Sequence, residues 1–345
     1  MTWHGSATRC AMHSEHAPRM AVVILNWNGA DFTERCLESL FSNTTHPACV
    51  VVVDNASRAD DVARLRCWME SSAAREGWRW MQLDGDEPPD PSADGLAPWL
   101  VLRTLSTQRG FSGGNNAGMR TALALTDPSH LLLLNNDTEL AADYFSTMEG
   151  VLRAEPDAAI VSGTIRELED RDMVWYAGGR LIPHRALAVH QVDEPTDDAP
   201  RQTDFITGCA MVISRSGLQA LGPLPECYFP AYMEDAEYSW RASRMGLRML
   251  YAPVPTVYHY GGGSAGRASR DAWPAYLNVR HRVLFIRRNL RGGVRWFALA
   301  YMAITKPVRA VLELARGRPR IGSALVRGLV RGMLDPRGTA GDGRR

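Results

Sequence analysis

The chain has 345 residues, of which 45% are hydrophobic and 22% are charged. This ordinary globular balance excludes wholesale disorder, a collagen-like repeat and a multi-span membrane protein. The net charge of +1 hides an uneven distribution, because residues 267–345 hold 18 basic and four acidic groups, whereas residues 1–266 hold 21 basic and 34 acidic groups. The body therefore has a net charge of −13 and the tail one of +14, which predicts that the tail meets an anionic partner.

The N-terminal residues and the cysteines indicate a cytoplasmic protein. Residues 1–19 are polar and rich in histidine, and they lack the apolar core of a signal peptide, so we expect a disordered leader. The six cysteines show neither a CxxC pair nor a zinc-binding spacing. We therefore expect reduced thiols without a disulfide framework.

Buried strands alternate with helices in the first part of the chain. Four continuous apolar runs, typical of strands buried on both faces, lie at residues 21–25, 50–53, 99–102 and 131–134. Asp31 and Glu34 have the spacing of a capping box that begins one helix, and a second helix is expected over about 60–74. This order predicts parallel strands with right-handed crossovers, and ligands bind such sheets beyond the carboxyl ends of the strands.

The rest of the chain is expected to be less regular. Residues 84–98 are rich in Asp, Pro and Gly and predict a surface loop, and residues 109–118 predict a glycine-rich loop that enters a helix. We expect short antiparallel strands and loops over 160–200. Further strands are expected at 205–214 and 250–259, a helix at 235–245, and helices from residue 275 onward.

Acidic and amide residues follow three of the predicted elements. They are Asp54 with Asn55, residues 135–137, and Glu234 with Asp235. Any one of these groups could simply cap a helix or form an Asx-turn, but their joint placement at one edge of a sheet favours a binding site. The glycine-rich segment is neither a Walker loop nor a GxGxxG motif, although free N–H groups at its helix start would suit a phosphate.

Six motifs in this order resemble the family-2 inverting glycosyltransferases of GT-A fold, and most closely their bacterial rhamnosyltransferase-like branch. The motifs are VVILNWNG (22–29), VVVDNAS (51–57), RGFSGGNNAG (109–118), LLLLNNDTEL (131–140), TGCAMVISR (207–215) and YFPAYMEDAEYSWRASRMGLRMLYAPVPTVYHYGGGS (228–264). Each motif is weak alone, but the ordered set covers roughly residues 20–290. The resemblance implies an α/β fold: a GT-A domain, with a Rossmann-like mixed sheet flanked by helices, and a C-terminal helical extension.

The resemblance also implies which residues bind the donor. Asp54 would hydrogen-bond a pyrimidine base, and Asn26 and Asn28 would line the nucleotide pocket. The nucleotide-sugar would be held by Arg109, Gly114, Asn115, Asn116 and Asn136. The implied donor is a nucleoside-diphosphate sugar with dTDP or UDP.

A divalent cation, Mg²⁺ or Mn²⁺, is implied as cofactor. The DxD-like motif makes Asp137 the main metal ligand, and His259 would complete the site, although from its residues alone a histidine between two tyrosines is better explained as an ordinary buried side chain. Asn135 replaces the first acidic residue of the motif, so diphosphate oxygens and water would supply more of the coordination. The resemblance makes Asp235 the catalytic base, and Glu234 would bind the acceptor or orient Asp235.

The basic tail has two open interpretations. Residues 321, 325, 329 and 333 are apolar at a four-residue spacing, and residues 296–304 form an apolar patch far shorter than the roughly 20 residues that span a bilayer. The pattern fits an interfacial helix pair on an anionic membrane, and it fits equally helices that pack on the catalytic domain with solvated arginines. A nucleic-acid partner is not expected, because no base-stacking or groove-reading module accompanies the charge.

We therefore predict a disordered leader over 1–19, a GT-A catalytic domain over 20–265, a basic amphipathic extension over 266–335 and a disordered tail over 336–345. The predicted activity is metal-dependent, inverting transfer of a sugar, most simply a deoxyhexose such as rhamnose, to a saccharide or lipid-linked saccharide acceptor of a cell-surface polysaccharide. If the tail binds membrane, the cytoplasmic protein would be peripheral on the inner face of the cell membrane.

Two other functions remain open from the sequence. A nucleotidyltransferase could share the fold, but it would need a Lys or Arg near the first loop, and residues 26–29 have none. A catalytically silent module that binds nucleotide-sugars or glycans is the second alternative, and the presence of Asp137, Asp235 and His259 argues against it.

Overall fold

The computed structural model describes residues 19–85, 89, 98–260 and 271–336. The predicted leader up to residue 18, most of the predicted loop at 84–98 and the tail after residue 336 lie outside the described residues. The first elements in chain order are β1 (Met20–Asn26), α1 (Ala30–Phe41), β2 (Cys49–Asp54), α2 (Ala59–Glu76), β3 (Arg79–Asp84), β4 (Trp99–Thr104), α3 (Gly110–Thr126) and β5 (His130–Asn135).

Shorter elements follow, among them two 3₁₀ helices labelled η. They are β6 (Thr138–Leu140), α4 (Tyr144–Ala154), β7 (Ala158–Glu167), β8 (Val174–Tyr176), β9 (Gly179–Ile182), η1 (Pro183–Arg185), β10 (Leu187–His190), β11 (Arg201–Gln202), β12 (Ala210–Ser214), α5 (Arg215–Leu221), η2 (Glu226–Tyr228), α6 (Glu234–Arg244) and β13 (Arg248–His259). Three long helices close the described chain: α8 (Ala272–Asn289), α9 (Gly292–Ala315) and α10 (Pro319–Leu334).

Eleven strands of the described residues form one mixed sheet. Its main path runs β11-β13-β7-β12-β5-β1-β2-β4-β3, with β6 paired to β13 and β8 paired to β7. Strands β5, β1, β2, β4 and β3 are parallel to one another, as the alternation of strands and helices predicts. The antiparallel strand β12 separates this parallel part from the parallel pair β7 and β13.

Each face of the sheet carries its own apolar core. On β1, Val22 and Ile24 pack with α1, α2 and α4 on one face, whereas Ala21 and Val23 pack with α3, α5 and α6 on the other. Successive side chains of a strand point to opposite faces, so a strand covered on both sides must be apolar throughout. This is the reason that the continuous apolar runs identified the strands correctly.

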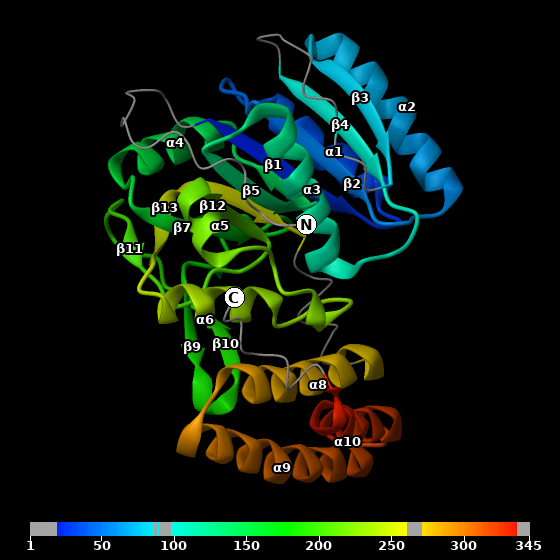
Figure 1. The fold of residues 1–345 in the computed structure, drawn as a ribbon, viewed down its shortest axis with the longest axis vertical. Helices are drawn as coiled ribbons and strands as arrows, with labels where there is room; N and C mark the ends of the chain where they lie inside the picture. The colour runs from blue at the N-terminus through cyan, green and yellow to red at the C-terminus, as the bar shows by residue number, and fades with distance from the viewer. Residues whose placement is uncertain (1–18, 86–88, 90–97, 261–270, 337–345) are drawn as a thin grey trace.

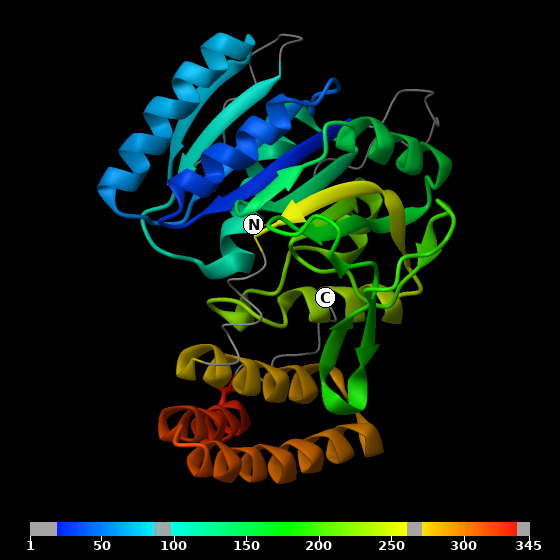
Figure 2. The same ribbon diagram turned by 180° about the vertical axis from the view of Figure 1, so that it is seen from behind.

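The three C-terminal helices form a separate layer below the sheet. Figures 1 and 2 show α8, α9 and α10 side by side at one end of the molecule, with the hairpin of β9 and β10 reaching towards them. A third apolar core holds the layer together and includes Val283 of α8, Met302 of α9, Leu325 of α10 and Tyr228 of η2. No described helix is long and apolar enough to cross a bilayer.

Three local predictions were wrong. The first helix begins after Gly29, and its predicted capping residues, Asp31 and Glu34, instead form ion pairs with Arg64 of α2. The glycine-rich segment is not a loop, because α3 begins at Gly110. The strand predicted at 205–214 begins only at residue 210. The short antiparallel strands and loops predicted over 160–200 are present as β8, β9 and β10, and the region also contains most of β7, a ten-residue strand that is parallel to β13.

Candidate functional site

Hydrogen-bonded side chains join the carboxyl ends of β1 and β2. The amide of Asn26 is fully buried and donates to Asp54 Oδ1 at 3.0 Å. The other oxygen of Asp54 accepts from the backbone N–H of Ser57 at 3.1 Å. Asn28 has a φ of 52°, and its side chain accepts from the N–H of Arg58 at 2.9 Å. At this edge of the sheet, Asn26 therefore holds in place the carboxylate of Asp54, which was predicted to hydrogen-bond the pyrimidine base of the donor.

The start of α3 packs directly on β1. A Cβ atom at Gly114 would lie 2.3 Å from Leu25 Cδ1, so any larger residue there would force the buried end of this side chain to move. Arg109 precedes the helix, and its backbone N–H donates to Asn55 Oδ1 at 2.8 Å. The glycine-rich motif thus positions α3 against the sheet, which accounts for part of its pattern without any ligand.

The two asparagines of this motif are engaged inside the protein. Asn115 donates to the carbonyl oxygen of Phe111 at 3.0 Å. The amide nitrogen of Asn116 donates to the carbonyl oxygen of Leu224 and to Glu226 Oε1, and its oxygen accepts from the N–H of Leu224. Asn115 therefore bonds within α3, whereas Asn116 joins α3 to the segment that begins η2.

Asp137 and His259 lie side by side because β6 pairs with the end of β13. His259 Nε2 is 3.4 Å from Asp137 Oδ2, and His259 is only 3% exposed. Neither ring nitrogen of His259 nor Oδ1 of Asp137 has a hydrogen-bond partner among the described residues. Buried polar atoms are normally hydrogen-bonded, and a carboxylate beside an imidazole fits a divalent cation such as Mg²⁺ or Mn²⁺.

The other two residues of the DxD-like motif, Asn135 and Asn136, supply no further carboxylate to this pair. Asn136 donates to Thr33 Oγ1 at 3.0 Å and to the carbonyl oxygen of Gly29 at 3.3 Å, so it ties the end of β5 to the start of α1. The described residues contain no group of three or more His, Cys, Asp or Glu side chains that could hold a metal. A cation at Asp137 and His259 would therefore take its other oxygens from a ligand and from water.

A strained turn leads into the two acidic residues of α6. Tyr232 and Met233 have φ angles of 82° and 79°, a left-handed conformation that costs a non-glycine residue about 1–3 kcal/mol. His281 of α8 is fully buried, and its Nδ1 lies 3.0 Å from the carbonyl oxygen of Ala231. Because a carbonyl oxygen can only accept, Nδ1 carries the proton and donates to the turn. Such strain persists only where neighbouring groups hold it, and it is frequent at active sites.

The carboxylates of Asp235 and Glu234 have different surroundings. Asp235 accepts from the backbone N–H groups of Gly208 (3.2 Å) and Ala236 (2.8 Å), whereas Glu234 Oε2 is buried without a partner among the described residues. Burial raises the pKa of both groups; these N–H donors oppose the shift for Asp235, and the nearby Asp235 charge adds to it for Glu234. Asp235 is therefore the carboxylate that ionises first, as a general base must.

A cavity of about 570 Å³ contains the proposed chemistry. Its lining includes Glu234, Asp235 and His259, so the structure brings the predicted base and the predicted metal ligand together. Asp137 joins them through its contact with His259. Among the predicted donor-binding residues, none lines this cavity: Asn26, Asn28, Asp54, Arg109, Gly114, Asn115, Asn116 and Asn136 lie at the ends of β1, β2 and β5 or in and before α3.

The comparison with known families agrees with this geometry. The model described as glycosyltransferase like family 2 matches residues 99–283, which is more than half of the chain. The chain belongs to this family. The resemblance inferred from the six motifs is thereby confirmed, and the protein is a glycosyltransferase.

Two curated relatives of this glycosyltransferase are distant but extensive matches. A low-salt glycan biosynthesis hexosyltransferase of Haloferax volcanii is 22% identical over 275 residues, which cover 80% of this chain and 78% of the relative. An N-acetylglucosaminyl-diphospho-decaprenol L-rhamnosyltransferase of Mycobacterium tuberculosis is 21% identical over 315 residues, which cover 87% of this chain and 96% of the relative.

Solved structures confirm the GT-A fold. A mannosyltransferase of Pyrobaculum calidifontis, in complex with GDP-Man and Mn²⁺, has a TM-score of 0.55 at 18% identity and covers 93% of this chain and 89% of its own. GalNAc-T7 with UDP, GalNAc and Mn²⁺ has a TM-score of 0.58 at 16% identity; the match covers 80% of this chain but only 48% of that one.

Several side chains of the cavity were missed by the sequence analysis. The ring of Trp175 lies 4.7 Å from that of His259 and 4.3 Å from that of His190, so aromatic groups border the predicted metal ligand. Arg282 of α8 and Lys306 of α9 bring positive charge to the same cavity. In the sequence, the only signal for Arg282 and Lys306 was the positive charge of the tail, and this charge did not distinguish them from the other basic residues there.

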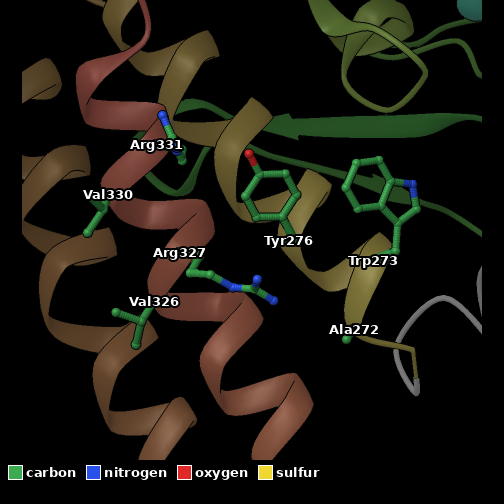
Figure 3. Close-up of a pocket in the computed structure, with 7 residues that line it drawn as sticks. All are labelled: Ala272, Trp273, Tyr276, Val326, Arg327, Val330 and Arg331. Carbon is green, nitrogen blue, oxygen red and sulfur yellow. The ribbon is translucent and has the colours of Figure 1, made fainter.

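A second cavity of about 660 Å³ lies between α8 and α10 (Figure 3). Trp273 and Tyr276 of α8 stack with ring centroids 5.5 Å apart, and Arg327 and Arg331 of α10 stand beside them. The described residues that line it include none of the predicted catalytic or metal-binding residues. This cavity therefore provides residues for control experiments on the catalytic one.

Proposed function

We propose that this glycosyltransferase is metal-dependent and inverting, and that it moves a sugar from a nucleoside-diphosphate donor to a hydroxyl group of a saccharide or glycolipid acceptor. The observation that carries the proposal is the position of Asp235. It lies in the first turn of α6, accepts hydrogen bonds from two backbone N–H groups and lines one cavity with His259.

Asp235 has the properties that deprotonation of an acceptor hydroxyl requires. It lies at the N-terminus of a helix, where the helix dipole favours negative charge. A positioned base contributes typically about 10²–10⁴-fold to the rate. With one base and in-line attack on the anomeric carbon, the configuration inverts and no covalent sugar–enzyme intermediate forms.

Asp137 and His259 would hold Mg²⁺ or Mn²⁺. When bound, such a cation stabilises the negative charge that develops on the departing diphosphate. The support in this chain is the set of partnerless atoms on these two residues. The two structural neighbours, each solved with Mn²⁺ and a nucleotide or nucleotide-sugar, are consistent with it.

For the donor we propose a deoxyhexose such as rhamnose, carried on dTDP or UDP. The support is the Mycobacterium tuberculosis relative, which is named an L-rhamnosyltransferase. Thermal-shift measurements with a panel of nucleoside-diphosphate sugars, with and without Mn²⁺, would test the choice, because a ligand that binds the native state raises Tm. A larger shift with a hexose donor than with dTDP-rhamnose would overturn it.

We further propose that α9 lies on an anionic membrane surface, peripherally and on the cytoplasmic side. Trp296, Phe297, Ile304 and Val308 are more than half exposed although they are apolar, and the tail has a net charge of +14. Apolar side chains with basic neighbours are typical of interfacial helices. Phe297→Ser and Ile304→Ser should reduce sedimentation with anionic liposomes, and equal sedimentation with neutral liposomes would refute this part.

The Asp235→Asn variant tests the central proposal. The amide keeps the size of the side chain but cannot take the proton, so we expect donor binding to persist and turnover to fall by about 10²–10⁴-fold. Glu234→Gln is the matched control and should lose less activity. Unchanged turnover in Asp235→Asn would reject Asp235 as base. A wild-type protein that binds nucleotide-sugars and transfers none would instead favour the binding module.

A further inference from the structure

Buried basic side chains line the cavity that contains the catalytic base. Arg282 of α8 and Lys306 of α9 are only 7% and 9% exposed, and Arg309 lies three residues beyond Lys306 on the same helix. All three line the cavity together with Asp235. The C-terminal helices therefore give this cavity a positively charged wall, which no sequence motif had indicated.

Among the residues that the structure describes, the two buried cations of this wall have no acidic partner. The hydrogen bonds of Arg282 within the described residues go to the backbone carbonyl oxygens of Arg185 and Ala186. No hydrogen bond or ion pair joins Lys306 to any of the described residues. A buried charge without a counter-charge is costly, so an arrangement of this kind indicates that an anion binds there.

Mutual repulsion makes the need for an anion stronger. Burial lowers the pKa of Lys306 to about 8, and the positive charges of Arg282, Arg309 and Arg185 add to the shift. Burial likewise lowers the pKa of Arg282 to about 10. Arg309 differs, because it is about half exposed and lies 3.9 Å from Glu313. A bound anion would lower the free energy of both buried cations at once.

We propose that Arg282, Lys306 and Arg309 bind a phosphate or diphosphate group that the sugar acceptor carries. The inference rests on the proposed glycosyltransferase reaction and adds the chemical class of its acceptor: a saccharide esterified to a phosphate. A cavity of about 570 Å³ has the volume of a typical small-ligand site. The phosphate held at the helical wall would bring a hydroxyl group of the attached sugar to Asp235.

The position of the cluster assigns it to the acceptor instead of the donor. Asp54 and Asn26, which were predicted to bind the nucleotide, lie at the ends of β1 and β2 and do not line this cavity. The Asp137–His259 pair, which fits a cation for the donor diphosphate, belongs to the sheet, whereas α8 and α9 form the layer below it (Figure 1). Donor and acceptor phosphates would thus be held from different layers.

Matched acceptors and variants test the proposal. One synthetic acceptor carries the sugar on an alkyl diphosphate, and the other carries the same sugar as an uncharged alkyl glycoside. Lys306→Met keeps the apolar stem and removes the charge, so KM for the diphosphate acceptor should rise about 10- to 100-fold, as expected for a charge-assisted hydrogen bond. KM for the uncharged acceptor and for the donor should stay unchanged. Arg331→Gln, in the second cavity, is the control and should change none of these values.

A binding measurement separates this inference from the proposed function. Calorimetry with inorganic pyrophosphate in EDTA, which removes metal-dependent binding, should show binding that Lys306→Met weakens at least about 10-fold and Asp137→Asn leaves unchanged. The calorimetric measurement requires no sugar transfer, so the expected result would support the anion site of Lys306 even if the protein turned over no donor. Pyrophosphate binding that Lys306→Met does not weaken would overturn the inference while leaving the proposed function intact.

Two further outcomes would also overturn it. If Lys306→Met raises KM for both acceptors equally, the residue has only a structural role; if it weakens binding to phosphatidylglycerol vesicles but not to pyrophosphate, the cations serve a membrane headgroup. Arg309→Gln, at an exposed position, replaces Lys306→Met if that variant does not fold, and a smaller loss for the diphosphate acceptor alone is expected. An unchanged KM in Arg309→Gln would then count against the proposal.

Discussion

Replacement of His281 should loosen the turn that holds Asp235. The Nδ1 N–H of His281 donates to the carbonyl oxygen of Ala231 at 3.0 Å and lies 3.2 Å from that of Tyr232. Leucine has comparable bulk and no donor, so His281→Leu leaves these oxygens without their partner, at a cost of about 1–3 kcal/mol. Asparagine can place an amide nitrogen close to the position of Nδ1, so His281→Asn should recover most of this stability.

The same variants should separate catalysis from donor binding. A misplacement of about 1 Å can cost roughly 100-fold in rate, so we expect kcat of His281→Leu to fall about 10- to 100-fold with donor KM unchanged. His281→Asn should remain near the wild-type kcat. The measurements are steady-state sugar transfer and guanidinium denaturation. Wild-type kcat in His281→Leu, or equal losses in both variants, would refute the reasoning, because the hydrogen bond would then not position Asp235.

The pH dependence of stability gives a second test of His281. Burial, aided by the charge of Arg280, lowers its pKa from 6.5 to about 4. Between these pH values the unfolded state binds more protons, so stability is full above pH 6.5 and is lost as the pH falls towards 4, in total by about 3 kcal/mol. His281→Asn should lack this loss. His130→Asn is the control: burial also lowers the pKa of His130 to about 4, so the stability profile should flatten while kcat stays unchanged.

Three further results are expected. Gly114→Ala should lose about 1–3 kcal/mol of stability in denaturant titrations, because its Cβ would overlap Leu25. In the pH profile of kcat/KM, the midpoint of the acid limb should lie above the ordinary aspartate pKa. Burial raises the pKa of Asp235, and activity is lost as the pH falls through that raised pKa. Glu237 is buried and pairs with Arg288 at 3.4 Å, so Glu237→Ala should lower the free energy of unfolding by about 3 kcal/mol and loosen α6 from α8. Unchanged stability of Gly114→Ala or of Glu237→Ala would contradict the contact of that residue. An acid limb at the ordinary aspartate pKa would contradict the raised pKa of Asp235.

The sequence predicted those elements that are buried on both faces. Strands β1, β2, β4 and β5 are continuously apolar except at their ends, and each was expected within two residues of its observed ends. β3 escaped prediction because it is an edge strand with a half-exposed, mixed sequence. The capping box failed because Asp31 and Glu34 find a cation on α2, a contact that local spacing does not reveal.

The predicted site residues divide according to whether their polar atoms are already hydrogen-bonded within the protein. Asp137 and His259 are far apart in the sequence and meet only because β6 pairs with β13, so only the motif order of the family indicated their contact. Asn116 and Asn136 also belong to motifs, but their amides hold Leu224 and Thr33, so a motif position does not distinguish a ligand-binding amide from one that holds the fold. Distinguishing them required the hydrogen-bond partners of each side chain.

The charge of the tail illustrates the same limit. Eighteen basic groups look equivalent along the sequence, and together they indicated an anionic partner. The structure divides them, because most arginines of α9 and α10 reach solvent while Arg282 and Lys306 are buried in the catalytic cavity. Lys306 is the only lysine in the chain, and its ammonium group is a compact charge. One tail can therefore bind two anionic partners. Its exposed arginines would bind an anionic membrane surface, and the buried cations beside Asp235 would bind a phosphate ester.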